Sequence, residues 1–483
     1  RHTTAPATLG DSGATFAVRI TDASGRSTIS LPATLSVVAA TRRTQHYVDP
    51  VNGTDSGDGS AAHPWRSLQT IVENHVETRN WNALPYAGDR TLVPVHPGAV
   101  VRAGDTIWLR SGYLGALDLR SAYNTAPITV AAAPGHTPRF SRILAQSAQN
   151  WILRGLQVSP SFDGSAAGNV VIVEDHNWRG PASDIEIDGL EVFTVPDEGV
   201  WTTAADWDTQ ASTGINTTGA RLWVHRCRLR NVNFGISMSG RAVRVDHNTI
   251  DGFCGDGLRG LGDDSVFEDN LVKNRRAVND NHPDGFQSWS LSDDGGVGSG
   301  VVRNIILRGN VFIAYESASV PFAGIIQGIG CYDGVYDGWI VENNLVVTNH
   351  WHGITFLGAR HCRIVNNTVV DLVPGDDATP WILVDAHKNG SPAADCVVRN
   401  NLTTALRIAP DPERNIVVDH NLVLPVDLSG YFVAPASFDY RLATNSPAID
   451  QGSLDLAPIS DAAGTPRPQG AAIDIGAFEF ASP

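Results

Sequence analysis

Short apolar stretches, each followed closely by an asparagine, recur along the second half of the chain. Apolar and polar side chains alternate within these stretches, which is typical of β-strands with one buried face. The asparagines are 20 to 40 residues apart, and a coil of 20 to 23 residues, with insertions in some coils, accounts for every interval. A repeat of this length predicts a solenoid. The asparagines are Asn248, Asn270, Asn310, Asn344, Asn367, Asn401 and Asn421.

The asparagines also indicate which kind of solenoid this is. If successive coils stack in register, the side-chain amides can hydrogen-bond to one another as a ladder inside the turn, as they do in other cross-β stacks. We therefore predict an all-β fold, a right-handed parallel β-helix, over residues 43–483. The alternative is an irregular all-β domain with asparagines in its turns, which leaves the matched spacing unexplained.

A second strand follows these asparagine turns and opens with a glycine. Strand alternation then predicts a column of residues at the bend before the glycine, an inward apolar column after it, and an outward column after that. We expect the glycines to form a flat strip that a ligand can approach. The glycines are Gly235, Gly257, Gly285, Gly324 and Gly353, preceded by Phe234, Asp256, Asp284, Ala323 and His352. The expected outward residues are Ser237, Arg259, Gln287, Ile326 and Thr355.

The first 42 residues have a different pattern. Residues 8–38 contain two alternating strands joined by a turn at residues 22–25. This segment resembles the last hairpin of an immunoglobulin-like domain. Two strands do not make a stable sandwich by themselves. We therefore assign residues 1–42 to a short N-terminal β extension or immunoglobulin-like remnant, and we expect further sequence upstream of it.

Composition narrows the range of partners. A formal charge of −16 without a basic patch argues against nucleic acid. The chain has no run of about 18 apolar residues, so we expect a soluble protein that does not insert into a membrane. Five cysteines leave at least one thiol unpaired in a monomer. Cys362 and Cys396 should be buried neighbours in successive coils, and we favour free thiols because parallel side chains are poorly placed for a disulfide.

Asp256 and Asp284 are the strongest candidates for chemistry. Adjacent coils of a parallel sheet lie about 4.8 Å apart, so the two carboxyl groups should be neighbours although they are far apart in sequence. Two carboxylates at that distance repel, so one keeps its proton or a cation lies between them. The first arrangement makes a general acid and the second a Ca²⁺ site. The alternative is that both residues only cap turns.

Two histidines could extend this site. His352 lies in the same column two coils beyond Asp284, roughly 10 Å away, which is a gap that a sugar ring could bridge. His282, in the phrase Asn281-His282-Pro283-Asp284, is close enough to act as a base or to orient one. Either histidine could instead be an incidental surface residue.

Other side chains are candidates for holding a substrate. Arg259 could neutralise a substrate carboxylate, and Gln287 could hydrogen-bond a hydroxyl. An ion pair with Asp263 or Asp264 is the alternative for Arg259. Tryptophans on a groove commonly stack against sugar rings, whereas core packing is the alternative. The remaining candidate substrate-binding residues are Trp201, Trp289, Trp351 and Lys388.

The opening segment from residue 46, the countable coils and the closing phrase at residues 461–480 together resemble the pectate-lyase-like superfamily of right-handed parallel β-helices. This resemblance implies a secreted, bacterial, carbohydrate-degrading protein. The two Asp-Gly phrases are similar to those of family 9 polysaccharide lyases, which hold Ca²⁺ with such aspartates and use a lysine base. That implies a Ca²⁺ bound by Asp256 and Asp284. The chain differs from the family pattern at His282-Pro283 and at Gln287, and it has no lysine in the neighbouring strand columns.

Three functions fit these features. A polysaccharide lyase would use His282, His352 or a lysine from a loop to remove the proton α to a uronate carboxyl, with Arg259 or a cation stabilising the enolate. A glycoside hydrolase would use Asp256 and Asp284 as its carboxyl pair, or one of them with Asp263 or Asp264. A glycan-binding or adhesive solenoid would need only the tryptophan-lined groove. We favour a secreted polysaccharide lyase whose partner is a polysaccharide or oligosaccharide.

Overall fold

The computed structural model describes residues 14–16, 19–21, 27–29, 33–34, 45–165, 168–292 and 294–481. The chain forms two compact units, residues 1–45 and residues 46–483. No helix among the described residues is long and apolar enough to span a membrane.

The N-terminal unit contains two short antiparallel strand pairs. β1 (Thr15–Phe16) pairs with β4 (Ala33–Thr34), and β2 (Arg19–Thr21) pairs with β3 (Ser27–Ile29). The expected turn at residues 22–25 lies outside the described residues. The resemblance to an immunoglobulin-like domain therefore stays a prediction.

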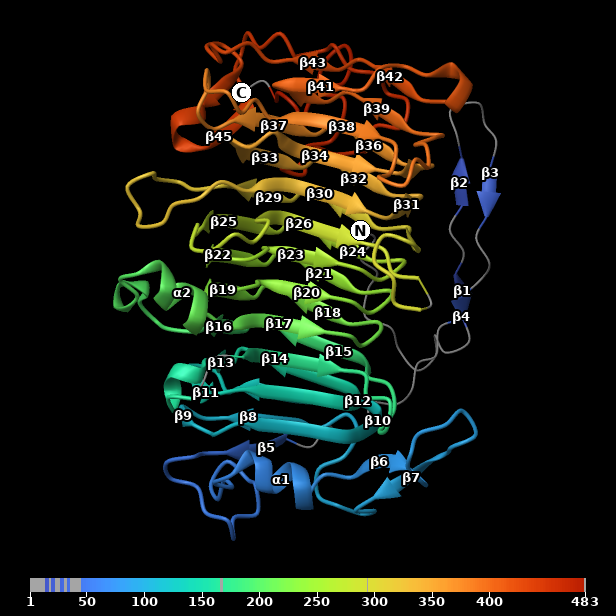
Figure 1. Ribbon diagram of the computed structural model, residues 1–483. Helices are drawn as coiled ribbons and strands as arrows, with labels where there is room; N and C mark the ends of the chain where they lie inside the picture. The colour runs from blue at the N-terminus through green and yellow to red at the C-terminus, as the bar shows by residue number, and fades with distance from the viewer. Residues whose placement is uncertain are drawn as a thin grey trace. The chain divides into compact units, whose positions relative to one another are not determined.

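The larger unit is a stack of coils whose strands pair in parallel with those of the next coil (Figure 1). Successive coils contribute strands to three long sheets. The first sheet contains β14 (Asn169–Glu174), β17 (Thr213–Thr217), β20 (Ile236–Met238), β23 (Leu258–Gly260), β26 (Asp284–Trp289), β30 (Gln327–Asp333), β34 (His352–Leu357), β38 (Trp381–Asp385) and β41 (Ala405–Arg407).

The second and third sheets complete each coil. The second contains β15 (Ser183–Asp188), β18 (Trp223–His225), β21 (Arg244–Asp246), β24 (Val266–Glu268), β28 (Ile306–Arg308), β32 (Ile340–Glu342), β36 (Arg363–Val365), β39 (Val397–Arg399) and β42 (Val417–Asp419). The third contains β9 (Gly112–Tyr113), β11 (Pro138–Phe140), β13 (Gln157–Val158), β16 (Glu191–Phe193), β19 (Arg228–Val232), β22 (Thr249–Phe253), β25 (Leu271–Arg275), β29 (Val311–Ile313), β33 (Leu345–Thr348), β37 (Thr368–Asp371), β40 (Leu402–Thr403) and β43 (Leu422–Val423).

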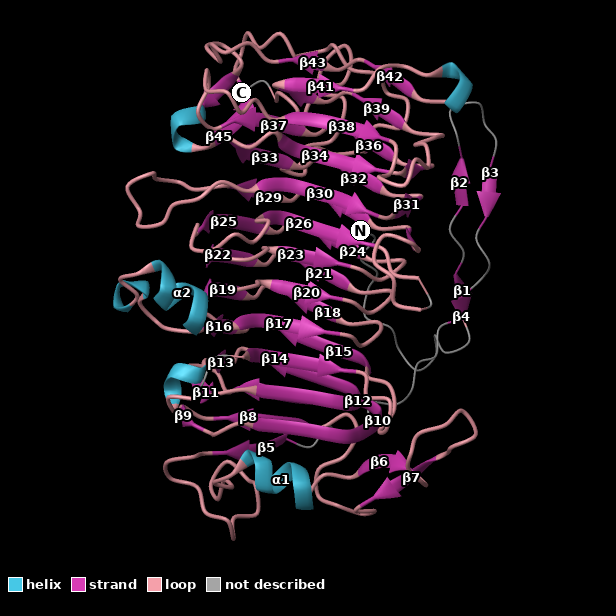
Figure 2. Ribbon diagram, in the orientation of Figure 1, coloured by secondary structure: helices cyan, strands magenta, loops and turns pink. Residues whose placement is uncertain are grey.

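Additional elements close and decorate the stack (Figure 2). Helix α1 (Leu68–Asn74) lies at its N-terminal end, where Leu68 and Ile71 are buried in the core. The side chain of Ser67 caps this helix and accepts a hydrogen bond from the Thr70 amide at 3.2 Å. The first coils also contain β5 (Gln45–Val48), β6 (Thr78–Trp81), β7 (Leu92–Val95), β8 (Thr106–Leu109), β10 (Leu117–Ala132) and β12 (Ile143–Arg154). Smaller elements are α2 (Ala204–Gln210), β27 (Val301–Arg303), β31 (Val335–Asp337), β35 (Ala359–Arg360), β44 (Phe432–Ala434), β45 (Asp439–Leu442) and the 3₁₀ turns Pro160–Phe162, Glu198–Val200, Pro412–Arg414 and Pro435–Ser437.

The predicted asparagine ladder is confirmed. Each ladder asparagine donates from its side-chain amide to the side-chain oxygen of the next, over 2.9 to 3.0 Å from Asn248 through to Asn421. The backbone amide of each also donates to that oxygen. The residue before each ladder asparagine has a positive φ, which turns the chain between the second and third sheets. These positions are His247, Asp269, Gly309, Asn343, Asn366, Asn400 and His420.

The predicted alignment of the coil at residues 323–330 with its neighbouring coils was wrong. Asp284 lies opposite Gln327 and Phe286 opposite Ile329, so Gln327 rather than Ala323 separates Asp284 from His352. The sequence contains two Gly-Ile phrases here, at residues 324–325 and 328–329, and the pairing selects the second. The outward residue of this coil is therefore Gly330 and not Ile326, which is fully buried.

The expected outward glycine strip was also wrong. A Cβ on Gly257 would lie 2.3 Å from Val272 Cγ1, and one on Gly285 would lie 2.7 Å from Phe312 Cδ1. These glycines therefore face the core, where apolar side chains of the third sheet fill the space at the bend. Glycine is required there because no larger side chain fits.

The prediction of free thiols is confirmed. All five cysteines are buried and unpaired, including Cys362 and Cys396. Both thiols contact backbone carbonyl oxygens of the core, Cys362 at Tyr336 and Cys396 at Ala359.

Candidate functional site

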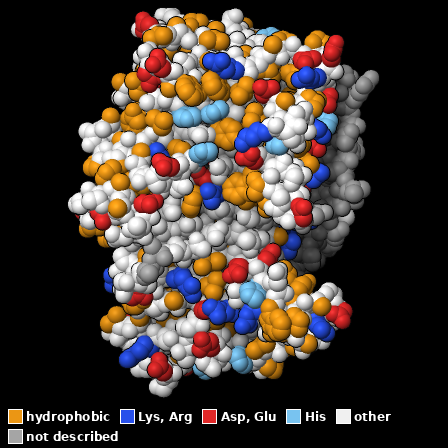
Figure 3. Space-filling model, viewed as in Figure 1, with side chains coloured by type: hydrophobic (Ala, Val, Ile, Leu, Met, Phe, Trp, Pro, Cys, Tyr) orange, Lys and Arg blue, Asp and Glu red, His pale blue; other side chains and the backbone are white. Residues whose placement is uncertain are grey.

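The candidate site lies on the outer face of the first sheet. The column at the bend runs through Phe234, Asp256, Asp284, Gln327 and His352 in consecutive coils. In the space-filling view, pale-blue histidine and orange hydrophobic side chains gather over the middle of this face, above β26, β30 and β34 (Figure 3). The fold therefore brings together the aspartates and His352, which are far apart in sequence.

Asp256 and Asp284 are neighbours, as their spacing predicts. The backbone amide of Asp284 donates to Asp256 Oδ1 at 3.0 Å, and Arg259 Nε donates to Asp256 Oδ2 at 2.6 Å. Both oxygens of Asp256 are therefore engaged. The expected alternative for Arg259 is not observed, because the charged partner of Asp263 is Arg303.

Asp284 is fully buried, with 0% of its surface exposed. Its Oδ2 accepts from Gln287 Nε2 at 2.9 Å, and its Oδ1 has no hydrogen-bond partner among the described residues. Burial and the nearby charge of Asp256 raise the pKa of Asp284 well above its usual value. Burial also raises the pKa of Asp256, while Arg259 opposes that increase. Asp284 therefore holds a proton more tightly than Asp256 does.

Because of this raised pKa, the stability of the protein should depend on pH. A carboxyl group with a pKa above 3.8 in the folded state binds its proton more tightly there than in the unfolded chain. The stabilisation from this tighter proton binding is fully present below the unfolded-state pKa, and it is lost as the pH rises through the folded-state pKa. Asp284→Asn has no proton to lose, so we expect the variant to gain stability relative to the wild type as the pH rises above the unfolded-state pKa of about 4.

Urea denaturation at several pH values tests this expectation. Asp55→Asn, at an exposed position, is the matched control and should follow the wild-type profile. Parallel profiles for wild type and Asp284→Asn would show that Asp284 is ionised in the folded protein.

The donor set at the pair does not fit Ca²⁺. That ion takes six to eight oxygen ligands. Here the Arg259 guanidinium and the Asp284 backbone amide each donate a hydrogen bond to one oxygen of Asp256. The side-chain amide of Gln287 donates to one oxygen of Asp284. Only the enclosed Asp284 Oδ1 is left. We therefore assign no metal-dependent step to these residues.

His352 lies in an aromatic surrounding that keeps it neutral. Its Nδ1 is 2.9 Å from Thr355 Oγ1, and its ring is 5.0 Å from Tyr332 and 5.1 Å from Trp381, edge to face in both cases. Burial lowers the pKa of His352 below 6.5, and burial with neighbouring histidines lowers the pKa of His350 to about 4. His352 is therefore an uncharged imidazole that can accept a proton at neutral pH.

Tyr332 joins this histidine to the acid pair. Its hydroxyl is buried without a hydrogen-bond partner among the described residues, and burial raises its pKa, so it keeps its proton. A Cβ on Gly330 would lie 2.1 Å from Asp284 Oδ1 and 2.7 Å from Tyr332 Cε2. The missing side chain of Gly330 therefore provides the space that the Asp284 carboxyl and the Tyr332 ring share.

The other candidates divide between surface and core. Trp351 is 51% exposed and stacks on Trp381, with ring centroids 6.3 Å apart. Trp289 is half-buried beside Arg259. Trp201 was expected on the sugar-binding face, but it is 4% exposed and packs edge to face on Trp207. An apolar cluster around the α2 insertion encloses it, so it cannot stack on a sugar.

His282 and Lys388 are both near the surface. His282 is exposed and close enough to Asp256 for its charge to lower the pKa of that carboxyl. Lys388 forms an ion pair with Asp333 at 2.7 Å, which occupies its ammonium group. Residues missed at this site are Gln327, Tyr332 and Arg407, and the correct alignment of β30 would have placed Gln327 and Tyr332 in it.

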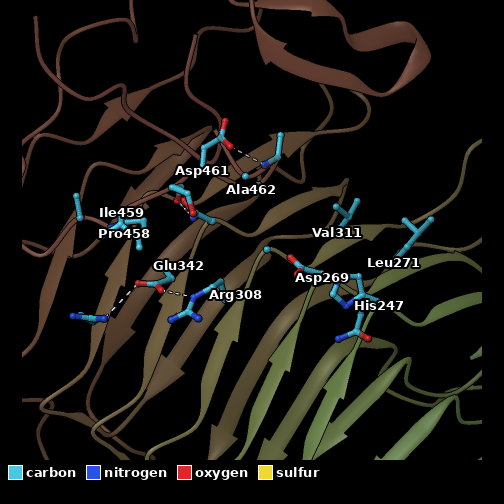
Figure 4. Close-up of a pocket in the computed structure, with 18 residues that line it drawn as sticks. His247, Asp269, Leu271, Arg308, Val311, Glu342, Pro458, Ile459, Asp461 and Ala462 are labelled. Carbon is cyan, nitrogen blue, oxygen red and sulfur yellow. Dashed lines mark hydrogen bonds and ion pairs between the residues drawn. The ribbon is translucent and has the colours of Figure 1, made fainter. Parts of the chain in front are cut away.

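Two other polar clusters lie outside this site. A cleft of about 780 Å³ separates the second sheet from the C-terminal segment at residues 457–464 and is lined by His247, Asp269, Arg308 and Glu342 (Figure 4). It contains none of the candidate residues. The second cluster consists of Glu186, Asp188 and His225, whose charges are matched by Arg154 and Arg226.

The comparisons with known proteins concern the fold. The family described as right-handed β-helix region matches residues 203–369. No curated protein sequence matches the chain. Its structure is similar to that of pectate lyase Pel9A, with 15% identity, 90% of this chain and 96% of that chain covered, and a TM-score of 0.47.

Two further solved structures show the same type of likeness. One is the GH136 lacto-N-biosidase from Eubacterium ramulus, with 13% identity, coverage of 78% of this chain and 67% of that chain, and a TM-score of 0.46. The other is a rhamnogalacturonan lyase, with 14% identity, coverage of 85% and 97%, and a TM-score of 0.41. The family match and the parallel strand register place the chain in the class of right-handed parallel β-helices.

Proposed function

We propose that the protein is a carbohydrate-active enzyme that cleaves a uronate-containing polysaccharide by β-elimination at the outer face of the first sheet. The observation that carries this proposal is the neutral imidazole of His352, held between Tyr332 and Trp381 on that face. A base and an aromatic surface are thereby gathered at one place.

The charge of this face supports an anionic substrate. The chain as a whole carries −16, which repels polyanions. At the site, however, Arg259 pairs with Asp256, Asp284 is fully buried with a raised pKa, and the pKa of His352 is lowered by burial. The polysaccharide therefore meets a local surface without excess negative charge.

The reaction needs one proton acceptor and one proton donor. The imidazole of His352 takes the proton from the carbon α to the uronate carboxyl, and the electron pair left behind forms the double bond to the β carbon. The bond from the β carbon to the glycosidic oxygen breaks, and the proton that His352 has taken passes to that oxygen. Tyr332, whose hydroxyl is buried and whose pKa is raised by burial, keeps its proton and packs against the imidazole.

Arg259 has a different role from the one expected. Three coil steps separate its column position from that of His352, which is roughly 14 Å. Its guanidinium also lies over Phe234, in the coil on the far side. Arg259 therefore cannot neutralise the carboxylate of the sugar that His352 deprotonates, and we assign it to the binding of a neighbouring sugar.

A panel of polysaccharides tests the proposal. A lyase produces unsaturated uronates, which absorb in the ultraviolet, together with new reducing ends. Reducing ends without that absorbance would indicate hydrolysis, and the absence of either product across the panel would indicate a binding protein.

Hydrolysis by the Asp256 and Asp284 pair is the second candidate function. It is favoured by the different protonation of the two carboxyl groups, which is the arrangement that acid catalysis requires. Against it, both carboxyl groups are buried and both oxygens of Asp256 are engaged. Asp284→Asn distinguishes the two functions, because it removes the acid of a hydrolase but leaves the imidazole of a lyase unchanged.

A further inference from the structure

Two arginines lie five coil steps apart in the outward column of the first sheet. In consecutive coils the column runs through Arg259, Gln287, Gly330, Thr355, Leu383 and Arg407. Five steps of about 4.8 Å separate the two arginines by roughly 24 Å along the stack. His352 lies between them.

Aromatic rings hold both guanidinium groups in place. Arg259 Cζ is 3.8 Å from the ring centroid of Phe234, and Arg407 Cζ is 4.5 Å from that of Trp381. Stacking fixes the plane of a guanidinium but leaves the N–H groups at its edge free. Such an edge is suited to a carboxylate, which it binds through two parallel hydrogen bonds.

Both arginines have hydrogen-bonding capacity to spare. Arg259 uses only Nε, in its bond to Asp256, and its two terminal nitrogens have no partner in the described part of the chain. Arg407 is exposed and has neither an ion pair nor a hydrogen bond to any described residue.

The surface between the arginines is aromatic and uncharged. Trp381 contacts His352, and His352 contacts Tyr332, edge to face in both cases. Gln287 carries no charge, and the Asp284 carboxyl to which it donates is fully buried. Positive charge therefore lies at Arg259 and Arg407, with aromatic rings between them.

We infer that an anionic polysaccharide lies along the stack across several coils, with one carboxylate bound by Arg259 and another by Arg407, on opposite sides of the sugar at His352. This inference rests on the proposed function, because it specifies the substrate of the same site. It requires a substrate long enough to span both arginines. The enzyme should therefore act within polymers and bind dimers weakly.

The test measures binding with the full-length His352→Ala protein, so that the ligand is not consumed. Isothermal titration at low salt is performed with oligomers of galacturonate, of glucuronate and of alginate uronates, from dimers to octamers. Neutral cello-oligosaccharides of the same lengths serve as comparators. We expect affinity for one uronate series to rise with length and to exceed that for the neutral series.

Adding Arg407→Ala or Arg259→Ala should lower octamer affinity about fivefold to tenfold, which corresponds to the loss of one charge-assisted contact at a partly exposed site. The effect on dimers should be much smaller, and Arg407→Lys should restore only part of the loss. The control is Arg441→Ala, because Arg441 is also exposed but is already paired with Asp439.

The outcomes separate this inference from the proposed function. If the wild type cleaves a polyuronate but octamer affinity is the same with and without Arg407, the inference fails and the function stands. If the length dependence and both arginine effects appear but no polyuronate is cleaved, the inference stands and the function fails. If no uronate series binds more tightly than the neutral series, the inference is overturned.

Discussion

Replacing His352 with alanine should reduce kcat/KM for the polysaccharide by about 10²- to 10⁴-fold, the usual contribution of a general base. The physical reason is that the imidazole is kept neutral by burial and is therefore ready to accept a proton. The loss should be mainly in kcat, because the side chain acts on the reacting atoms. Initial rates of unsaturated product formation measure it.

A matched histidine variant controls for nonspecific effects. His361 is exposed and hydrogen-bonded to Asp337, outside the candidate site, so His361→Ala should retain wild-type activity. The pH profile of the wild type adds an independent readout. Because the pKa of His352 is lowered, the acidic limb of kcat/KM should lie below pH 6.5. An acidic limb above that value, or full activity of His352→Ala, would exclude His352 as the base.

Replacing Asn344 with alanine should lower the free energy of unfolding by about 3 to 5 kcal/mol, in the range of the most disruptive single substitutions. Asn344 is fully buried, and its amide donates to Leu307 O and to Asn367 Oδ1, both at 2.9 Å. Its oxygen accepts two hydrogen bonds from Asn310. Truncation therefore strands buried donors and acceptors in two neighbouring coils, each costing about 1 to 3 kcal/mol before relaxation.

The last residue of the ladder provides the comparison. Asn421 accepts from Asn401 in the same way, but it is half-buried and donates only to backbone carbonyls. Water can replace some of its contacts, so Asn421→Ala should cost distinctly less, about 1 to 2 kcal/mol. Urea denaturation of both variants measures the difference. Equal losses would mean that the ladder does not act as a connected network.

The repeating features of the fold were predictable because each recurs many times. The asparagine ladder, the inward apolar residues and the proximity of Asp256 to Asp284 all follow from the coil spacing. The alignment within one particular coil is not supported by repetition in other coils. The two Gly-Ile phrases at residues 324–329 fit the pattern equally well, and only strand pairing shows that Gln327 and Gly330 lie at the site.

Features that depend on the direction of a side chain were harder to predict from the sequence. The sequence indicated that Trp201 and Trp351 belong to insertions or lie near the site, but it did not show that one faces the core and the other the solvent. The Arg407 stack on Trp381 was missed because neither residue belongs to a recognisable motif. Likewise, the bond between Arg259 and Asp256 depends on which way a long side chain turns, and the sequence offered several acidic neighbours.

The asparagine ladder and the candidate site occupy different corners of each coil. The ladder lies in the turn between the second and third sheets, whereas the site is formed by outward residues at the start of the first sheet. Substrate specificity can therefore change by substitution in a single coil while the hydrogen bonds that set the coil spacing remain intact. Each coil contributes its own outward residues, whereas the ladder keeps the spacing between coils constant. The surface that a ligand contacts can therefore change without a change of fold.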